Sequence, residues 1–516
     1  MGRKSTILGG ALLLTASNLL LRLISIGFNA YLKGQIGAAG LGLLQLISTV
    51  GLFAALVGAS GVRVSAMVLS AEEFGHRRLR GVKTAMSVCL RYGLMLSSVV
   101  GTALFFASRA IAVGWLGDAR AALSLRWMGL LLPFSCLCGI LTGYFTACSR
   151  IRQIVGIEIA ERLVSVVFTL LLLRFWAGND LQKACCSITL GSSLGAAFDC
   201  ILLYRVYRRD MHGIREDDRF SMGKRLFKLC VPLALNDYLR SGLNTAEQLL
   251  IPYGLARYSG SGESAMAAYG TIQALVFPVL LFPASVLYSL SDLLVPELSR
   301  AKAMGRGRRI RDLTDKCLRM CLLFAATVAG FLYVAAPYLG QWLYRSGEAG
   351  RLLRIFSPMV LMLYLDALTD GMLKGLAEQL PCVRYNTLSS VLDVILLPIL
   401  LPRWGIDGYV LCFVVTHAIN LVLSLRRLLK VTGYRFSWDA WGKPLFCLLL
   451  CLCFCHAFPA PLSLIGFLPL ILSLYVLTNS LLPTPHRQHS TTSDRSRRGR
   501  CPHRPEQAIP ICKDLR

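Results

Sequence analysis

Apolar runs long enough to cross a lipid bilayer recur from one end of this chain to the other. A transmembrane helix needs roughly 20 mostly apolar residues, because its backbone amides must find their partners inside the segment. Of the 516 residues, 55% are hydrophobic and only 16% are charged, and the mean hydropathy is +0.58. The sequence therefore predicts an all-α, polytopic membrane protein with no separate soluble domain.

The apolar runs, bounded by charged and Pro/Gly-rich loops, predict about 14 transmembrane helices. The expected ranges are 7–32, 41–69, 85–107, 127–147, 154–176, 184–206, 227–252, 267–293, 316–337, 355–377, 383–402, 406–425, 442–458 and 461–482. The first run follows basic residues, as in a signal peptide, but it is too long for one and carries Arg22 inside it. We therefore interpret it as the first membrane helix.

The distribution of the 55 Lys and Arg residues predicts the orientation in the membrane. If the N-terminus is cytoplasmic, the great majority of them fall on the cytoplasmic side, as the positive-inside rule requires. We expect a multi-pass protein of the bacterial cytoplasmic (inner) membrane with both termini cytoplasmic. The net charge of +27 is spread over short loops instead of one globular face, which argues against nucleic-acid binding.

The longest cytoplasmic segments divide the chain into parts. We expect an N-terminal lobe at 1–206, a cytoplasmic linker at 207–226, a C-terminal lobe at 227–428 and two further helices within 429–482. The tail at 483–516 is rich in Ser, Arg, His and Pro and is expected to be disordered, with its basic residues near anionic membrane lipids.

Two predicted helices carry polar side chains along one face. In the first helix these are Thr15, Asn18, Arg22, Ser25 and Asn29. In the seventh they are Asn236, Arg240, Asn244, Glu247 and Gln248, with Asp237 beside them. Ionisable groups are costly in lipid and usually face a cavity, so the stripes predict a pseudo-symmetric pair lining one water-filled chamber. Alternatively, they only join helices through hydrogen bonds.

Guanidinium groups remain charged and bind phosphate oxygens through bidentate hydrogen bonds. A cavity containing Arg22, Arg240 and Arg63 would therefore prefer an anionic headgroup, although Arg63 could equally snorkel to water near a helix end. Asp237 and Glu247 would then orient the arginines or bind sugar hydroxyls.

The spacing of Asp366, Asp370 and Lys374 at i, i+4 and i+8 predicts one of two arrangements. Asp370 and Lys374 would form an ion pair within the helix, or the two aspartates would bind a coupling ion.

Neither a catalytic site, a metal site nor a cofactor is expected. The cysteines lie mainly inside apolar runs, where they behave as small hydrophobes, so no disulfide framework is expected. Cys451, Cys453 and Cys455 point to different sides of a helix and cannot close a zinc site with His456. Membrane-embedded enzymes generally place catalytic carboxylates or histidines in long extramembrane loops, whereas every predicted loop here has about 20 residues or fewer, which argues against an enzyme. The sequence also contains no Walker A motif, which is consistent with transport that is not driven by ATP.

Part of the chain resembles a known family. The resemblance is carried by Tyr238-Leu239-Arg240-Ser241, Leu249-Leu250-Ile251-Pro252, Ala268-Tyr269-Gly270, Phe282-Pro283-Ala284 and Val295-Pro296-Glu297-Leu298-Ser299, and by Ile36-Gly37-Ala38-Ala39-Gly40 near the start. These residues resemble the stage V sporulation protein B family of the multidrug/oligosaccharidyl-lipid/polysaccharide (MOP) exporter superfamily, which is similar to the MurJ lipid II flippases.

The resemblance implies a MATE/MurJ-like fold of 14 helices in two pseudo-symmetric lobes around a central cavity. It also implies alternating-access transport of a polyprenyl-diphosphate-linked glycan, such as a peptidoglycan precursor, with cell-wall synthesis proteins as candidate partners. Arg22 falls where MurJ-like proteins carry an arginine. Their second arginine, after a Tyr in the eighth helix, is missing here because Tyr269 is followed by Gly270-Thr271-Ile272-Gln273; Arg240 is a candidate substitute.

Three functions remain open at this stage. A flippase for lipid-linked anionic glycans is favoured. A cation-coupled multidrug antiporter would use Asp366, Asp370 or Glu247 to bind Na⁺ or H⁺ and would have an acidic cavity. A membrane-embedded glycan polymerase is the third, but His417 and His456, the histidines within predicted helices, have no evident catalytic partner.

Overall fold

The computed structural model describes residues 2–59, 61–148, 150–178, 180–216 and 219–434, with a few isolated residues beyond. Over these ranges the chain is helical and contains no β-strand. The helices are α1 (Gly2–Ala59), α2 (Val62–Gly75), α3 (Leu79–Gly114), α4 (Ala121–Ala147), α5 (Ile151–Leu172), η1 (Leu173–Ala177), α6 (Leu181–Asp210), α7 (Arg219–Ser259), α8 (Gly262–Gly270), η2 (Thr271–Val276), α9 (Phe277–Leu281), α10 (Ala284–Ala303), α11 (Gly307–Tyr344), α12 (Gly347–Phe356), η3 (Ser357–Met359), α13 (Val360–Gly375) and α14 (Gln379–Thr432).

The two longest helices are each folded back at a glycine. Gly37 in α1 has φ of 71° and Gly405 in α14 has φ of 56°, a backbone conformation that side chains with a Cβ rarely adopt. α1 therefore consists of two arms on either side of Gly37, and α14 of two arms on either side of Gly405. This is why two predicted helices fall within each of them.

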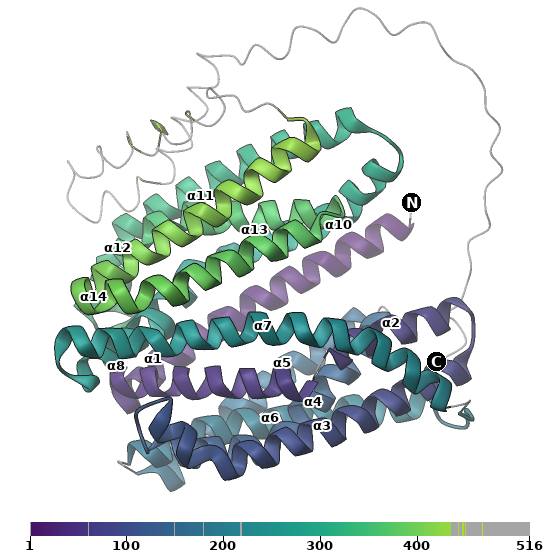
Figure 1. Ribbon diagram of the computed structural model, residues 1–516, viewed down its shortest axis with the longest axis horizontal. Helices are drawn as coiled ribbons and strands as arrows, with labels where there is room; N and C mark the ends of the chain where they lie inside the picture. Colours follow the sequence, from purple (N-terminus) through teal and green to yellow (C-terminus); the bar gives the residue numbers. More distant parts are fainter. Residues whose placement is uncertain are drawn as a thin grey trace, which may run out of the picture.

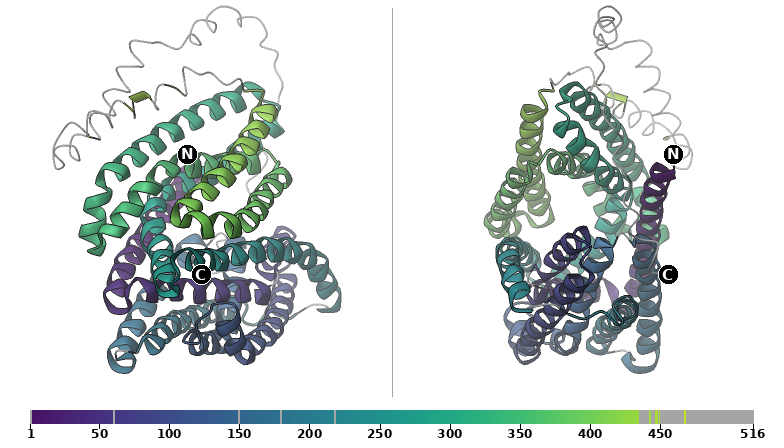
Figure 2. Two further views of the ribbon diagram at one scale, coloured as in Figure 1. Left: turned by 60° about the vertical axis from the view of Figure 1, so that its left-hand side comes forward. Right: turned by 90° about the vertical axis from the view of Figure 1, so that its right-hand side faces the viewer.

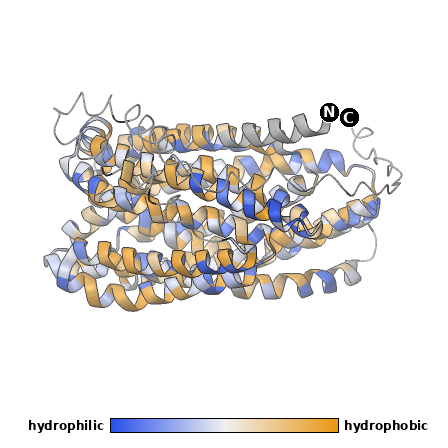
Figure 3. Ribbon diagram, turned by 90° about the horizontal axis from the view of Figure 1, so that it is seen from above, coloured by the Kyte–Doolittle hydropathy of each residue, from blue (hydrophilic) through white to orange (hydrophobic). Residues whose placement is uncertain are grey.

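The prediction of an all-α membrane protein is confirmed. Each expected range up to 406–425 overlaps helical segments over most of its described length, and eight of the described helices are long and apolar enough to cross a membrane. Apolar residues run along the helices in Figure 3, and large apolar side chains such as Phe106 and Trp342 are exposed on the outside. Such a surface suits lipid and not water. The ranges 442–458, 461–482 and 483–516 lie outside the continuously described residues.

The described helices form two groups, which Figures 1 and 2 show one above the other. In one group α2, α3, α4, α5 and α6 pack on each other, and in the other α10, α11, α12, α13 and α14 do so. α1 and α7 run between them, and each contacts both groups. The polar faces of α1 and α7 are therefore held where the two groups meet.

Candidate functional site

A polar cavity of about 640 Å³ lies between α7, α14 and the second arm of α1. The side chains that α7 contributes are Asp237, Arg240, Ser241, Asn244, Glu247 and Gln248. They are three or four residues apart along the helix, so one face of α7 presents them together. α14 closes the opposite side with Asn386, Ser389, Ser390, Asp393, Tyr409, Phe413, His417 and Asn420.

Most of the predicted stripe of α7 lines this cavity. Asp237, Arg240, Asn244, Glu247 and Gln248 all contribute, whereas the side chain of Asn236 lies outside the described part of the structure. The contributions of α14 were not predicted. Asn386, Ser390 and Asp393 lie at helical spacing inside an apolar run, the same signal that revealed α7, and could have been found in that way.

Two aspartates of α13 meet two asparagines of α14 next to this cavity. Asn420 Nδ2 donates to Asp366 Oδ2 at 2.8 Å and to Asn386 Oδ1 at 3.1 Å, and Asn386 Nδ2 donates to Asp370 Oδ2 at 3.0 Å. The remaining oxygens, Asp366 Oδ1, Asp370 Oδ1 and Asn420 Oδ1, are buried and have no hydrogen-bond partner among the described residues. Buried oxygens without donors are costly, and this set suits a small cation or a proton.

The expected ion pair between Asp370 and Lys374 is not present among the described residues. Lys374 is exposed, and among the described residues Asp370 takes its hydrogen bond from Asn386 and forms no ion pair with Lys374. The i, i+4 spacing therefore does not reflect an ion pair within the helix.

The cavity carries more acidic groups than the sequence predicted, since three arginines were expected to line it. Three carboxyl groups line it, from Asp237, Glu247 and Asp393, against the single guanidinium of Arg240. A lining of this kind is acidic when its carboxyl groups are ionised. It can bind a cation, or accept hydrogen bonds from the hydroxyl and amide groups of a sugar. For an anion, Arg240 is the one lining residue with a positive charge.

Arg22 and Asn18 line a second, smaller pocket of about 230 Å³. The other residues around it are Leu21, Ser25, Arg162, Ser285 and Tyr288. The Arg22 guanidinium donates to the carbonyl oxygen of Leu281 and lies 5.6 Å from the centre of the Tyr288 ring. Leu281 also lines the larger cavity, so it separates the two. Arg22 and Arg240 thus occupy neighbouring pockets and not the single shared chamber that the two stripes predicted.

The polar stripe of α1 serves two purposes. Asn29 Nδ2 donates to the carbonyl oxygen of Ala274 at 2.8 Å, and the nearby Lys33 Nζ donates to that of Tyr344 at 2.7 Å. These bonds fasten α1 to η2 and α11, as the helix-joining interpretation expected. Among the stripe residues whose side chains the structure describes, Asn18, Arg22 and Ser25 line the pocket.

Arg63 lies apart from both pockets. It stands near the start of α2, its side chain is exposed, and its Cδ passes beside Gly139 of α4. Its charge interacts with Glu158 of α5. Of the three arginines that the sequence assigned to one cavity, the structure therefore brings none into the same pocket as another.

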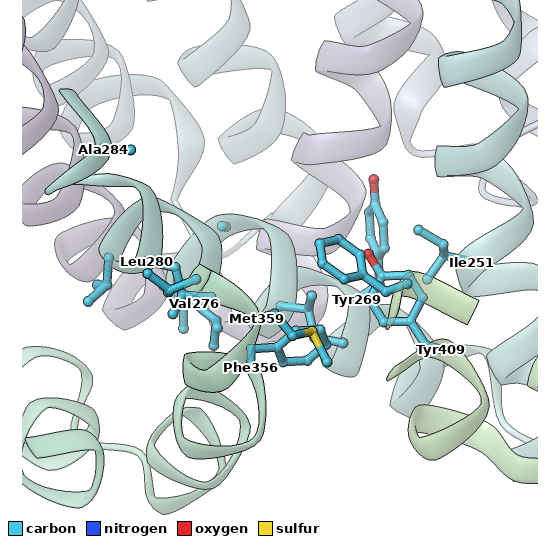
Figure 4. Close-up of a cluster of buried hydrophobic side chains, with 14 of the residues drawn as sticks. Ile251, Tyr269, Val276, Leu280, Ala284, Phe356, Met359 and Tyr409 are labelled. Carbon is cyan, nitrogen blue, oxygen red and sulfur yellow. The ribbon is translucent and has the colours of Figure 1, made fainter. Parts of the chain in front are cut away.

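A layer of buried aromatic residues closes the larger cavity toward the end of the molecule that carries Gly37 and Gly405. Tyr269 and Tyr409 lie close together there, with Phe356 beside Tyr409 (Figure 4). The Tyr269 hydroxyl donates to Gln248 Oε1 at 2.9 Å. A separate open pocket is lined by residues 113–120, at the end of α3 and in the loop after it, by residues 261–264, at the start of α8, and by Leu249. Gln248, which lines the cavity, and Leu249, which lines the open pocket, are adjacent in α7, so this helix contributes to both spaces.

Comparison with known proteins gives one family and one fold. The family described as "Polysaccharide biosynthesis protein" matches residues 7–302. Stage V sporulation protein B of Bacillus subtilis (strain 168) is 21% identical over 451 residues, which cover 84% of this chain and 87% of the relative. The uncharacterized membrane protein YabM of the same organism is 23% identical over 441 residues, covering 81% and 79% of the two chains.

Two solved structures share the fold. The lipid II flippase MurJ in an inward closed conformation superposes with a TM-score of 0.71 at 13% identity, covering 91% of this chain and 98% of that one. An inward-facing multidrug resistance MATE transporter of the MOP superfamily gives 0.64 at 13% identity, covering 82% and 99%. The two-lobed, MATE/MurJ-like fold that the resemblance implied is therefore confirmed.

Proposed function

The chain belongs to the polysaccharide biosynthesis protein family, and on that premise we propose that it is a flippase for a lipid-linked anionic glycan. The substrate is a polyprenyl-diphosphate sugar such as lipid II or a related peptidoglycan or polysaccharide intermediate. The protein moves the headgroup across the bacterial cytoplasmic membrane by alternating access, while the polyprenyl tail stays in the lipid. No covalent bond is made or broken.

The polar cavity between α7 and α14 is the observation that carries this proposal. A glycan headgroup forms hydrogen bonds to water and loses them in hydrocarbon. It can cross the membrane only along a surface whose polar groups form hydrogen bonds in their place. The amides of Asn244, Gln248 and Asn386 and the hydroxyls of Ser241 and Ser389 offer such partners inside an otherwise apolar molecule. Arg240 contributes the positive charge that draws an anionic headgroup toward this surface.

The proposed orientation follows from the predicted topology. With both termini cytoplasmic, the end with Gly37 and Gly405 faces outward, and the Tyr269 and Tyr409 layer closes the outer exit. Rocking of the 1–206 and 227–428 regions would then open this layer and close the cytoplasmic side, which releases the headgroup outside.

Two sources of energy fit this site. The membrane potential, negative inside, favours outward movement of an anion by roughly 2.3 kcal/mol per charge per 100 mV. A cation bound at the unpaired oxygens of Asp366, Asp370 and Asn420 would add a second source, because its binding and release could alternate with those of the glycan.

A cation-coupled multidrug antiporter is the second candidate. It is favoured by the three carboxyl groups of Asp237, Glu247 and Asp393 in the cavity, because cationic drugs need such partners. The two candidates are separated by substrate: overexpression of an antiporter raises drug resistance, whereas a flippase restores growth to a strain depleted of its own flippase.

The direct test follows headgroup accessibility in proteoliposomes that contain a fluorescent polyprenyl-diphosphate disaccharide. We expect Arg240→Ala to lower the initial translocation rate by about tenfold or more, since a charge-assisted hydrogen bond to the substrate is lost. Arg257→Ala is the matched control, because Arg257 is on the same helix but stacks on Tyr253 at 4.7 Å, outside the cavity. Equal rates for wild type and Arg240→Ala would exclude the cavity as the headgroup path.

A further inference from the structure

We infer that the small pocket beside α1 is a phosphate subsite, in which Arg162 of α5 provides a second guanidinium opposite Arg22. This assignment rests on the proposed function, because it supplies the place where the diphosphate of the lipid carrier binds. The glycan would then occupy the larger cavity beyond Leu281.

The lining of this pocket is polar and carries no negative charge. Apart from Leu21, every lining residue has a hydrogen-bonding side chain, and two of them are arginines. The acidic residue next to Arg162, Glu161, interacts with its charge but is not part of the lining. Among the described residues, neither arginine forms an ion pair, so two positive charges face one space in the interior of a membrane protein. An anion between them would remove this repulsion.

Ser285 gives independent evidence that the pocket takes a ligand. Its side chain is only 2% exposed, and its Oγ has no hydrogen-bond partner among the described residues. Buried hydroxyl groups are nearly always paired, because an unpaired one loses its hydrogen bonds to water without replacement. Ser285 lines the same pocket as the two arginines, so its hydroxyl is a candidate donor to a phosphate oxygen bound there.

The Arg22 side chain is held in place before any ligand binds. One nitrogen donates to the Leu281 carbonyl oxygen, and the guanidinium lies over the Tyr288 ring. These contacts fix its remaining donors toward the pocket and reduce the ordering cost of binding. The volume of about 230 Å³ is below the roughly 300–1,000 Å³ of drug-sized sites and suits a small anion better than a glycan.

The position of the pocket gives the subsite a mechanical role. α1 packs on both α5 and α10, which belong to the two different helix groups. A phosphate bound by Arg162 from one group and Ser285 from the other would bridge them. Separation of the groups would pull these donors apart, so binding of the anion favours the arrangement described here and release accompanies its opening.

Two sources of phosphate share this chemistry, the diphosphate of a polyprenyl carrier and the headgroup of an anionic phospholipid. We would measure binding of farnesyl diphosphate, which has no glycan, to the full-length protein in nanodiscs of phosphatidylcholine. The same titration in nanodiscs containing phosphatidylglycerol separates the sources: a phospholipid site would already be filled and would show weakened farnesyl diphosphate binding.

We expect Arg162→Ala to weaken farnesyl diphosphate binding by about tenfold or more, and Arg162→Lys to weaken it less, because lysine keeps the charge but loses the bidentate hydrogen bonds. Ser285→Ala should weaken it by a few fold. Arg91→Ala, which removes the same charge from an exposed position on α3, is the matched control and should bind like wild type. Size-exclusion chromatography would verify that each variant is folded.

Wild-type affinity in folded Arg162→Ala, or equal losses in Arg162→Ala and Arg91→Ala, would overturn the subsite. These results are distinguishable from failure of the proposed function. If farnesyl diphosphate binding depends on Arg162 but wild type does not translocate the lipid-linked disaccharide, the subsite stands and the flippase proposal falls. If wild type translocates the lipid-linked disaccharide but farnesyl diphosphate binding does not depend on Arg162, the flippase proposal stands and the subsite falls.

Discussion

The pocket beside α1 and the cavity beside α7 have similar polar stripes at their base and opposite charge in their linings. The α1 pocket contains the two guanidinium groups of Arg22 and Arg162 and no lining carboxyl group. The α7 cavity contains three carboxyl groups and Arg240. The neighbouring helices make this difference, because α5 adds an arginine to the first and α14 adds Asp393 and amides to the second.

This comparison shows that corresponding stripes do not make a symmetric chamber. We interpret the pair as a division of labour, in which the α1 pocket binds the anionic part of a substrate and the region of α7, α13 and α14 binds its polar part and a cation. Each of the following changes tests one side of this division.

The largest effect is expected for Arg22→Ala. The change removes one of the two positive charges of the α1 pocket, the bond to the Leu281 carbonyl oxygen and the contact with Tyr288. We expect translocation of the lipid-linked disaccharide to fall by about a hundredfold, in line with the loss of two interactions of a charged group, and complementation of a flippase-depleted strain to fail. Arg91→Ala should complement normally. Growth of the Arg22→Ala strain at normal expression would contradict the role of this pocket.

A smaller effect is expected for Asp366→Asn, which neutralises a carboxyl group without changing its size. The asparagine oxygen can still accept from Asn420, but the position of the unpaired Asp366 Oδ1 no longer attracts a cation. Translocation should lose its response to an imposed Na⁺ or pH gradient and slow by about tenfold.

The stability of Asp366→Asn provides a second measurement. Because the change removes a buried carboxyl oxygen without a partner, the melting temperature should stay the same or rise. Asp407→Asn, at an exposed position of α14, is the matched control and should keep the gradient response. A gradient response in Asp366→Asn equal to that of wild type would show that the cation site lies elsewhere.

The fold was predictable because its causes are local. Apolar runs of bilayer length, bounded by charged loops, place every expected helix up to 406–425. The break at Gly37 lies in the loop expected between the first two helices, and the break at Gly405 lies between the eleventh and twelfth. The sequence could not reveal that α1 runs between the two helix groups, since this depends on contacts such as that of Lys33 with Tyr344.

The candidate site was predictable only along each helix. The stripe of α7 identified five cavity residues because helical spacing fixes which side chains share a face. Spacing does not show which helices face each other, so Arg22 and Arg240 were placed in one chamber and Arg162 was not assigned to any. The missed residues of α14, including Asn386 and Asn420, are polar residues in an apolar run, and their partners on α13 became evident only from the packing.

The smallest effect is expected at the barrier that closes the α7 cavity. Tyr269→Phe keeps the ring but removes the hydroxyl that donates to Gln248, at a cost of about 1 kcal/mol. Tyr364→Phe is matched to it, because Tyr364 is equally buried and its hydroxyl donates to the Leu280 carbonyl oxygen at 2.7 Å, away from the barrier. Both variants should lose similar stability. Only Tyr269→Phe should increase amide hydrogen exchange in residues 262–276, by about fivefold, because local opening of the barrier becomes easier by the same free energy. Equal exchange in this segment for the two variants would mean that the Tyr269–Gln248 bond contributes to general packing, and that the outer end of the cavity is held closed by the aromatic rings alone.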